Sequence, residues 1–213
     1  MTGVAPAARA FLALGDSYTI GEGVAPQDRW THQLAAALTA EGHAVQTPQT
    51  IATTGWTTDE LQAGIAAAAP TGPFELVSLL IGVNNQYRAL PLDDYAAQFG
   101  ALLAQAVGFA GDRPGRVIVL SIPDWGVTPF ARQQGRDESQ TAQQIDAFNA
   151  VAQAICQARG VVFVDITPAS RAQGRDPAML ADDGLHPSAR MYAHWCGQAL
   201  PVARRALSDR GSA

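Results

Sequence analysis

Short apolar runs alternate with longer amphipathic or alanine-rich segments along most of this chain. Turn residues bound each run, which is typical of strands that a parallel sheet buries on both faces. The runs predict strands at residues 10–14, 44–52, 74–81, 116–121 and 161–165. Pro48 interrupts the second run, and because proline cannot donate to a central ladder, we expect this strand at an edge of the sheet.

The segments between these runs predict helices, because they are rich in alanine, leucine and glutamine. Thr57 and Glu60 match a capping box, which starts a helix just beyond Gly55. Pro187 suits the first position of the closing helix. The other expected helices, with the body of the closing one, cover residues 30–40, 91–109, 137–159 and 191–207. Strands that alternate with helices imply right-handed βαβ units, and therefore a three-layer α/β/α fold around a five-stranded parallel sheet.

The chain has the size and composition of one domain. Its 213 residues would make two independent cores small, and 47% hydrophobic with 15% charged residues indicates an extensive core. We therefore expect a single domain over residues 1–213, with a flexible tail at residues 1–9. The apolar runs are much shorter than the ~20 residues that a bilayer crossing needs, so no membrane span is expected. The first ten residues lack the apolar core of a secretory signal, which predicts a cytoplasmic location.

The charged residues exclude several classes of function. The net charge is −5, and all 14 basic residues are arginine. Without lysine, Schiff-base chemistry and a phosphate-loop lysine are excluded. The arginines are scattered in an acidic background, which argues against nucleic acid as a partner. Cys156 and Cys196 fall in different expected helices and show no metal-ligand spacing, so we expect free buried thiols and no metal site.

The first strand runs into Gly15, Asp16 and Ser17. Ligands of open α/β sheets bind beyond the carboxyl ends of the strands, so the Ser17 hydroxyl stands where chemistry is usually done. Asp16 and Ser17 are also common caps of a helix or turn. This stretch alone leaves both interpretations open.

A serine nucleophile needs a base, and the base needs an acid that orients it. Asp183 and His186 are three residues apart, which in a tight turn brings a carboxylate beside an imidazole. The other histidines, His32, His43 and His194, lie in expected helices or a turn, where a surface or core role is favoured.

An oxyanion needs hydrogen-bond donors that are in place before the reaction. The candidates are the backbone amides of Ser17 and Gly55 and the side-chain amide of Asn84, which follow the first three strands. Taken singly, Gly55 is better explained as a turn glycine and Asn84 as a turn or cap residue. Taken together with Asp183 and His186 at one edge of the sheet, they favour a common site.

Four blocks in this order resemble the SGNH hydrolase family, also called GDSL esterases and lipases. The blocks are GDS with Ser17, ATTGWTTDEL with Gly55, IGVNNQYR with Asn84, and DGLHP with Asp183 and His186. The resemblance implies a flavodoxin-like fold, a Ser17, His186 and Asp183 triad, an oxyanion hole from Ser17, Gly55 and Asn84, and hydrolysis of carboxylic esters without a cofactor. Asp16 would then hold the nucleophile loop through hydrogen bonds.

Two residues depart from the family pattern. Tyr18 replaces the leucine of the GDSL motif, and Asn85 stands where aspartate is frequent. Neither removes a catalytic group, but both change the residues that could surround a substrate. The candidate lining residues also include aromatic and basic neighbours of the site, for which plain packing is the alternative. The full candidate set is Tyr18, Trp56, Asn85, Tyr87, Arg88 and Trp125. The loops at residues 133–136 and 169–178 are candidate rims.

These observations lead to a serine esterase as the main hypothesis. The substrate would be a small-molecule ester, with acyl esters, thioesters and lysophospholipids in its range. Acyl transfer to an alcohol could use the same acyl-enzyme. A flavodoxin-like module that binds phosphate at its first loop is the alternative from another class, but it would not explain Asn84, Asp183 and His186.

Overall fold

The computed structural model describes residues 8–208, and within them the five expected strands form one parallel sheet. The strands are β1 (Phe11–Gly15), β2 (Gln49–Ala52), β3 (Leu76–Leu80), β4 (Val117–Leu120) and β5 (Val162–Val164). Their order across the sheet is β2-β1-β3-β4-β5, which is the flavodoxin-like order. The fold class expected from the sequence is confirmed, and β2 lies at an edge as Pro48 indicates.

Helices connect the strands and cover both faces of the sheet. The α-helices are α1 (Ser17–Ile20), α2 (Trp30–Ala40), α3 (Thr58–Ala68), α4 (Val83–Tyr87), α5 (Leu92–Phe109), α6 (Pro129–Gln133), α7 (Glu138–Ala158), α8 (Thr167–Gln173) and α9 (Ala189–Ser208). Short 3-10 turns are η1 (Pro26–Asp28), η2 (Pro114–Arg116), η3 (Trp125–Val127) and η4 (Pro177–Met179).

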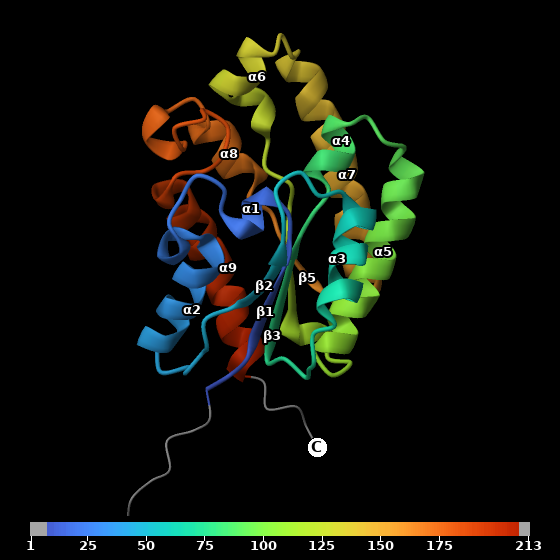
Figure 1. The fold of residues 1–213 in the computed structure, drawn as a ribbon, viewed down its shortest axis with the longest axis vertical. Helices are drawn as coiled ribbons and strands as arrows, with labels where there is room; N and C mark the ends of the chain where they lie inside the picture. The colour runs from blue at the N-terminus through green and yellow to red at the C-terminus, as the bar shows by residue number, and fades with distance from the viewer. Residues whose placement is uncertain (1–7, 209–213) are drawn as a thin grey trace, which may run out of the picture.

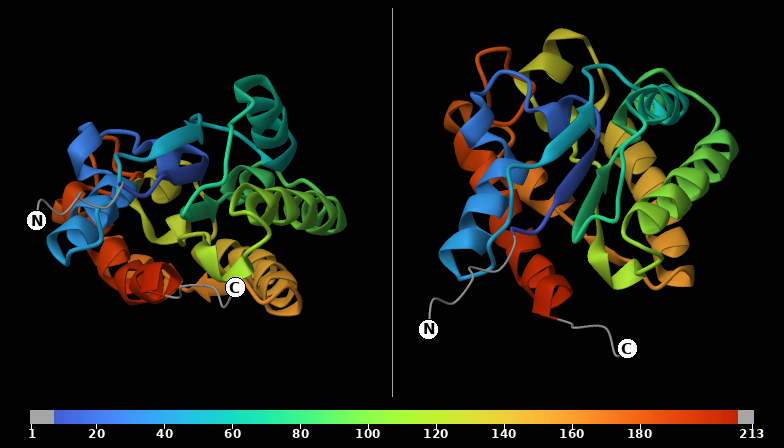
Figure 2. Two further views of the ribbon diagram at one scale, coloured as in Figure 1. Left: turned by 90° about the horizontal axis from the view of Figure 1, so that it is seen from below. Right: turned by 60° about the horizontal axis from the view of Figure 1, so that its bottom comes forward.

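The long helices form two layers with the sheet between them. Helices α2 and α9 pack together on one face, and α3, α5 and α7 pack together on the other (Figure 1). Views from two further directions show the same separation (Figure 2). Every residue of β1, β3 and β4 is buried, because both faces are covered. This explains why these strands have continuous apolar sequences instead of alternating ones.

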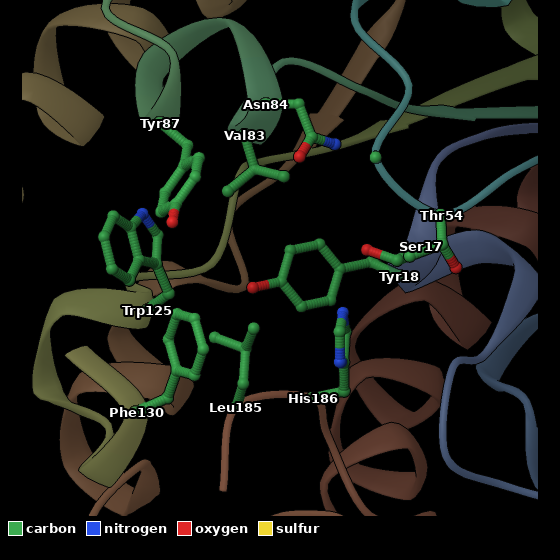
Figure 3. Close-up of a pocket in the computed structure, with 11 residues that line it drawn as sticks. Ser17, Tyr18, Thr54, Val83, Asn84, Tyr87, Trp125, Phe130, Leu185 and His186 are labelled. Carbon is green, nitrogen blue, oxygen red and sulfur yellow. The ribbon is translucent and has the colours of Figure 1, made fainter. Parts of the chain in front are cut away.

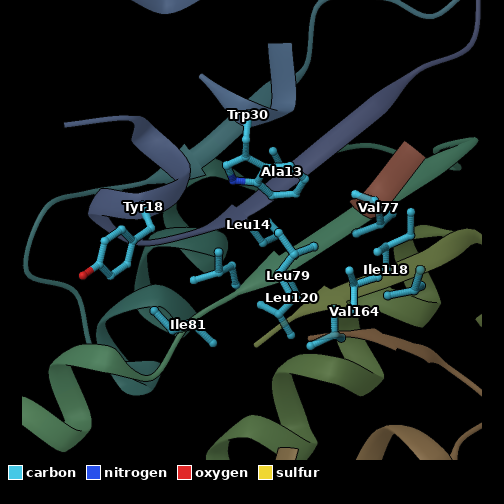
Figure 4. Close-up of a cluster of buried hydrophobic side chains, with 14 of the residues drawn as sticks. Ala13, Leu14, Tyr18, Trp30, Val77, Leu79, Ile81, Ile118, Leu120 and Val164 are labelled. Atoms are coloured by element: carbon cyan, nitrogen blue, oxygen red, sulfur yellow. The ribbon is translucent and has the colours of Figure 1, made fainter. Parts of the chain in front are cut away.

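The register of the central strands places large apolar side chains next to one another. Leu14 of β1 pairs with Leu79 of β3, and Leu79 pairs with Val119 of β4. Helix α2 adds Trp30, which is fully buried on the face of the sheet that α2 and α9 cover (Figure 4). Removing this apolar surface from water stabilises the sheet at roughly 25 cal/mol per Å², and it gives the loops at the strand ends a rigid support.

The chain leaves the sheet in opposite directions after neighbouring strands. From β1 it continues into α2 on one face, and from β3 it continues into α5 on the other. Such a topological switch point leaves a crevice at the carboxyl ends of β1 and β3. Gly15 ends β1 at this crevice. A Cβ atom at Gly15 would lie 2.4 Å from the carbonyl oxygen of Leu80, so only glycine lets the two strand ends come this close.

Several expectations about the elements need correction. Pro187 does not start the closing helix, because α9 begins at Ala189 and Pro187 instead forms an antiparallel bridge with Leu180. The second strand is shorter than expected and begins only at Gln49. The short helices α1, α4, α6 and α8 were not expected, since four to seven residues are too few to show a helical period.

The expected tail at residues 1–9 is only partly described, since residues 1–7 lie outside the described part of the chain. Arg9 bridges Val45, and its guanidinium donates to the carbonyl oxygen of Leu207 at 2.8 Å. This residue is therefore held against both the β2 side and the end of α9, and it does not belong to a free tail.

Candidate active site

Ser17 is the first residue of the one-turn helix α1, directly beyond β1. Asp16 caps this helix, because its Oδ1 accepts a hydrogen bond from the Tyr18 amide at 3.0 Å. Gly21 ends the helix in the left-handed conformation with φ 71°, which glycine adopts at little cost. The expected role of Asp16 as a holder of this loop is confirmed. The Ser17 side chain faces the crevice at the switch point, where it lines a pocket.

His186 and Asp183 lie on the loop between η4 and α9. Asp183 Oδ2 is 2.5 Å from His186 Nδ1, and Asp183 Oδ1 accepts from the amides of Leu185 and His186, each at 2.9 Å. One carboxylate therefore shapes the turn with one oxygen and holds the imidazole with the other. This arrangement leaves Nε2 of His186 as the ring nitrogen that can serve a substrate or Ser17.

The loop is closed by its own hydrogen bonds. The Ala181 amide donates to the His186 carbonyl at 2.7 Å, and the Ser188 amide donates to the Met179 carbonyl at 2.9 Å. Burial raises the pKa of Asp183, but hydrogen bonds from the His186 ring and the Leu185 and His186 amides outweigh this, and the pKa lies below its usual value of 3.8. Asp183 is therefore held as the carboxylate that a neighbouring imidazolium needs.

The pocket brings together residues from five separate segments of the chain, 17–18, 54–55, 83–87, 125–130 and 185–186. His186 is buried, with 8% of its surface exposed, and its ring lies 5.6 Å from that of Tyr18. Figure 3 shows a ring nitrogen of His186 directed toward the side of the pocket where Ser17 lies. Asp183 does not line the pocket, because it contacts the opposite edge of the imidazole. This is the order in which a nucleophile, a base and an acid would act.

Gly55 and Asn84 approach the same pocket from the loop after β2 and from α4. Gly55 has φ 89°, a conformation that favours glycine. Its carbonyl accepts from the Arg88 guanidinium at 2.6 Å, while Asn84 Nδ2 donates to the Trp56 carbonyl at 2.9 Å. An amide nitrogen carries two hydrogens, so one Nδ2 hydrogen of Asn84 remains available.

The backbone amides of Ser17 and Gly55 make no hydrogen bond to any other residue in the described part of the chain. Unused donors are uncommon in folded proteins, because an unpaired backbone amide costs free energy. Here Ser17, Gly55 and Asn84 all line the same cavity. The arrangement can stabilise negative charge on an oxygen placed next to Ser17.

The remainder of the pocket is apolar. The cavity has a volume of about 200 Å³, and its far end is lined by Val83, Tyr87, Trp125, Phe130 and Leu185. The ring centroids of Tyr87 and Trp125 are 5.3 Å apart, and those of Trp125 and Phe130 are 6.5 Å apart. The Trp125 indole donates to Gln86 Oε1 at 2.8 Å, which fixes its orientation. Polar catalytic candidates therefore occupy one end of the pocket and aromatic walls the other.

Arg136 covers the outer side of these walls. Its guanidinium lies 4.8 Å from the Tyr87 ring centroid and 5.6 Å from that of Trp125, which are cation–π distances. The expected rim at residues 133–136 is thus in contact with the pocket walls. The second expected rim is the loop at residues 169–178. Its Ser170 and Gly174 line a small cavity behind the pocket and not the pocket itself.

Three of the six candidate lining residues, Tyr18, Tyr87 and Trp125, line the pocket. The other three do not. The Trp56 ring packs over Gly64 of α3, and buried Asn85 is bonded to Thr58. Arg88 bonds to the Gly55 carbonyl and to Glu60 at 3.3 Å. These side chains support the site from behind, because α3 and α4 offer them nearer partners than the cavity does.

Four lining residues were missed by sequence reasoning, namely Thr54, Val83, Phe130 and Leu185. Thr54, Val83 and Leu185 directly precede Gly55, Asn84 and His186, so adjacency to a candidate residue was an available signal. Phe130 lies on α6, far from any block in the sequence. No pattern marks it.

Several other ionisable groups are buried. Burial raises the pKa of Asp16 from 3.8 to about 7, against the effect of backbone hydrogen bonds that lower it. Both cysteines are free and buried, as expected, and burial raises the pKa of Cys156 to about 12 and of Cys196 to about 11. Their thiols are therefore poor nucleophiles at neutral pH.

Between residues 8 and 208, no three histidine, cysteine, aspartate or glutamate side chains are placed to hold a metal ion together. No helix in the same range combines the length and apolar character that a bilayer crossing requires.

Comparison with known proteins agrees with this architecture. A sequence model described as the GDSL-like lipase/acylhydrolase family matches residues 13–194. No curated protein matches the chain by sequence. Among solved structures, TesA has a TM-score of 0.74 at 18% identity, with 93% of this chain and 100% of that chain covered.

Two further structures have similar likeness. A lipase/acylhydrolase from Enterococcus faecalis has a TM-score of 0.68 at 21% identity, covering 96% of this chain and 100% of its own. Axe2, an acetylxylan esterase from Geobacillus stearothermophilus, has a TM-score of 0.68 at 20% identity, covering 92% of this chain and 94% of its own. At these identities the likeness establishes the shared fold.

Proposed function

Because the chain belongs to the GDSL-like lipase/acylhydrolase family, a family of carboxylic ester hydrolases, we propose that it hydrolyses small-molecule esters through an acyl-enzyme on Ser17. The observation that carries this proposal is that His186, held by Asp183 at 2.5 Å, lines the same pocket as Ser17. A flavodoxin-like module that binds phosphate would leave this pair without a role.

In the first half of the reaction, His186 Nε2 takes the proton of the Ser17 hydroxyl as the oxygen attacks the ester carbonyl carbon. The carbonyl oxygen becomes an oxyanion, which the Ser17 and Gly55 amides and the Asn84 side chain stabilise. Asp183 stabilises the imidazolium that forms. The tetrahedral intermediate then breaks its bond to the alcohol oxygen, and His186 gives the proton to the leaving alcohol.

In the second half, water replaces the alcohol. His186 deprotonates the water as it attacks the acyl-enzyme, the same three donors hold the second oxyanion, and the Ser17 oxygen leaves with the proton from His186. The products are a carboxylic acid and the free enzyme. If another alcohol attacks in place of water, the same site transfers the acyl group, and product analysis with added alcohol separates the two outcomes.

The test compares wild-type protein with Ser17→Ala and His186→Ala on p-nitrophenyl acetate, butyrate and octanoate. Each variant is expected to lose most of its kcat, since Ser17 and His186 act as one unit. His194→Ala is a matched control, because His194 is exposed on α9 outside the pocket. Labelling of the wild type, but not of Ser17→Ala, by a fluorophosphonate probe identifies the nucleophile. Undiminished hydrolysis by both active-site variants would contradict the proposal.

A further inference from the structure

Tyr18, the residue that departs from the GDSL pattern, lies inside the pocket. It is buried, with 3% of its surface exposed, and its ring packs against His186 at 5.6 Å and against Trp195 at 5.8 Å between centroids. Figure 3 shows the Tyr18 ring extending across the pocket from the side of Ser17, with its hydroxyl directed toward Trp125, Phe130 and Leu185. The phenol therefore places a polar atom at the apolar end of the cavity.

The Tyr18 hydroxyl forms no hydrogen bond with any other described residue. A leucine at this position, as in the family motif, would make the same region wholly apolar. The buried, unpartnered side-chain atoms of the described residues do not include Tyr18 Oη, so this hydroxyl opens onto the cavity, where water or a ligand can pair with it. The Tyr18 hydroxyl is therefore a hydrogen-bond donor that is available to a substrate in addition to the candidate catalytic groups.

The far wall of the pocket limits how deep a substrate can reach. Tyr18, Trp125 and Leu185 line both the main pocket and a rear cavity of about 20 Å³, so they form a partition between the two. The hydrogen bond from the Trp125 indole to Gln86 holds this partition in place. The partition closes the far end of the main cavity of about 200 Å³, which suits an acyl chain of short to medium length.

We propose that the Tyr18 hydroxyl recognises a second, uncharged oxygen near the far end of the acyl group, so that the preferred substrates are esters of short or medium oxygenated acids. This inference rests on the proposed function, because it takes the aromatic end of the pocket as the acyl site next to Ser17. A keto, hydroxy or ether oxygen would accept a hydrogen bond from the phenol, while an alkyl chain would leave the phenol unpaired.

The surrounding charges favour a neutral oxygen over a carboxylate. Burial raises the pKa of Tyr18 above its usual range, and the negative charges of Asp16, Asp183 and Asp124 raise it further. The phenol therefore remains protonated and able to donate. When ionised, these carboxylates would also repel an anionic acyl terminus. Arg136 lies outside the aromatic walls and is not among the residues that line the cavity.

The experiment uses pairs of esters that have the same shape and differ only in the acceptor. One pair is p-nitrophenyl 5-oxohexanoate and p-nitrophenyl 5-methylhexanoate, and two further pairs are one carbon shorter and one carbon longer. The quantity measured is the ratio of kcat/KM for the oxo ester to that for the methyl ester. Comparing this ratio between wild type and Tyr18→Phe cancels the intrinsic reactivity of each ester.

We expect the ratio to fall by about five- to tenfold in Tyr18→Phe for at least one pair, which is the effect of one hydrogen bond. Tyr87→Phe is the matched control, because it removes a hydroxyl from another lining tyrosine and should keep the wild-type ratio. Equal ratios in wild type and Tyr18→Phe for all three pairs would overturn the inference. That result is also expected if the Tyr18 hydroxyl faces only the rear cavity and never meets the substrate.

The inference can still be tested if Tyr18→Phe does not fold, and its failure can be told apart from failure of the proposed function. If Tyr18→Phe does not fold, inhibition of the wild type by the product acids supplies the same comparison: 5-oxohexanoic acid should inhibit more strongly than 5-methylhexanoic acid, and equal inhibition contradicts the inference. If the folded wild type hydrolyses none of the esters and is not labelled at Ser17, the proposed function itself fails. Hydrolysis that depends on Ser17 but ignores the second oxygen refutes only the role of Tyr18.

Discussion

Asp183 uses its two carboxylate oxygens for different purposes. Oδ1 accepts from the Leu185 and His186 amides and so sets the turn, while Oδ2 holds the His186 ring at 2.5 Å. An asparagine could still accept the two amide hydrogens through its side-chain oxygen. It could not serve as an anionic partner for a protonated imidazole. Position 183 therefore allows the chemical role to be removed while the turn is kept.

Asp183→Asn is expected to lower kcat by roughly 10³- to 10⁴-fold, the size of effect seen when a triad aspartate becomes an amide, with little change in thermal stability. The reason is the loss of charge beside His186 and the wrong tautomer of the ring. The measurement is kcat on p-nitrophenyl butyrate together with a thermal melt. Asp182→Asn, which alters the exposed neighbouring aspartate, should retain activity. A retained kcat in Asp183→Asn would exclude Asp183 as the acid.

Asn84→Ala is expected to lower kcat by about 10²- to 10³-fold with a smaller change in KM, because the lost side-chain donor acts on the oxyanion and not on the bound ester. Steady-state kinetics on the same substrate measures both parameters. A variant that raises KM alone would place Asn84 in substrate binding. Asn85→Ala, one residue away, is the comparison: it should lower stability more than kcat, which separates loss of the oxyanion donor from loss of packing.

For single residues, the sequence predicted which candidate catalytic residues lie together better than it predicted the residues around them. That His186 contacts Asp183 and shares a pocket with Ser17 could be predicted, because a nucleophile, a base and an acid restrict both the residue types and their spacing. Trp56 and Arg88 were wrongly expected in the pocket, since their neighbours on α3 and α4 take them away from it. Phe130 could not be predicted, because a lining residue needs only to be apolar and its position depends on how α6 folds back.

Among the elements, two of the shortest helices position candidate catalytic residues. Helices α1 and α4 follow β1 and β3 directly and carry Ser17 and Asn84. The strands and long helices could be predicted from their periodicity, and Trp30–Ala40 agrees with the expected helix at both ends. One-turn helices have no period to detect, and they form here because the tertiary structure supports them.

Asn85 joins α4 to the start of α3. Its Oδ1 accepts from the Thr58 amide at 3.1 Å and its Nδ2 donates to the Thr58 hydroxyl at 2.7 Å, with both residues buried. Asn85→Ala should lower the free energy of unfolding by about 1–3 kcal/mol, because it leaves buried polar groups of Thr58 without this partner. Urea denaturation measures this.

Asn84→Ala provides the opposite pattern, with a large loss of kcat and a smaller loss of stability, because the Asn84 side chain reaches the pocket. If the two variants lost stability and kcat to the same extent, the division between a chemical and a structural asparagine would be wrong.

On the scale of the whole molecule, the region behind Ser17 is a low-dielectric interior that contains polar atoms. Asp16 is fully buried, and its Oδ2 receives no hydrogen bond from the described residues. In the same described part of the chain, other buried polar atoms without partners lie on α1, α2 and α9, namely Thr19 Oγ1, Trp30 Nε1, Tyr192 Oη and Trp195 Nε1. The Asp16 carboxyl group therefore lies in an interior that excludes water.

The raised pKa of Asp16, about 7 compared with 3.8, makes global stability depend on pH. Between these values the folded carboxyl is protonated while the unfolded one is ionised, so unfolding releases a proton. The stabilising contribution is complete below pH 3.8, falls as pH rises and is lost above about pH 7, a change of about 4 kcal/mol. Asp16→Asn removes this titration.

Urea denaturation at pH 5, 6, 7 and 8 checks the prediction. The free energy of unfolding of the wild type should fall relative to Asp16→Asn as pH rises across this range. A constant difference between the two proteins would show that Asp16 does not titrate in this window. The Asn side chain can still accept from the Tyr18 amide, so the cap of α1 is retained.

The loop that carries Asp183 and His186 is closed by its own bridge between Leu180 and Pro187, whereas Ser17 stands on the central sheet. The two parts of the site are therefore anchored independently, and local unfolding of one loop would separate them without melting the core. Heating would then cause reversible inactivation before the cooperative transition, and amide hydrogen exchange at Leu185 and His186 would be faster than at β1. A covalent inhibitor on Ser17 that also bonds to the imidazole would tie the two parts together and slow that exchange.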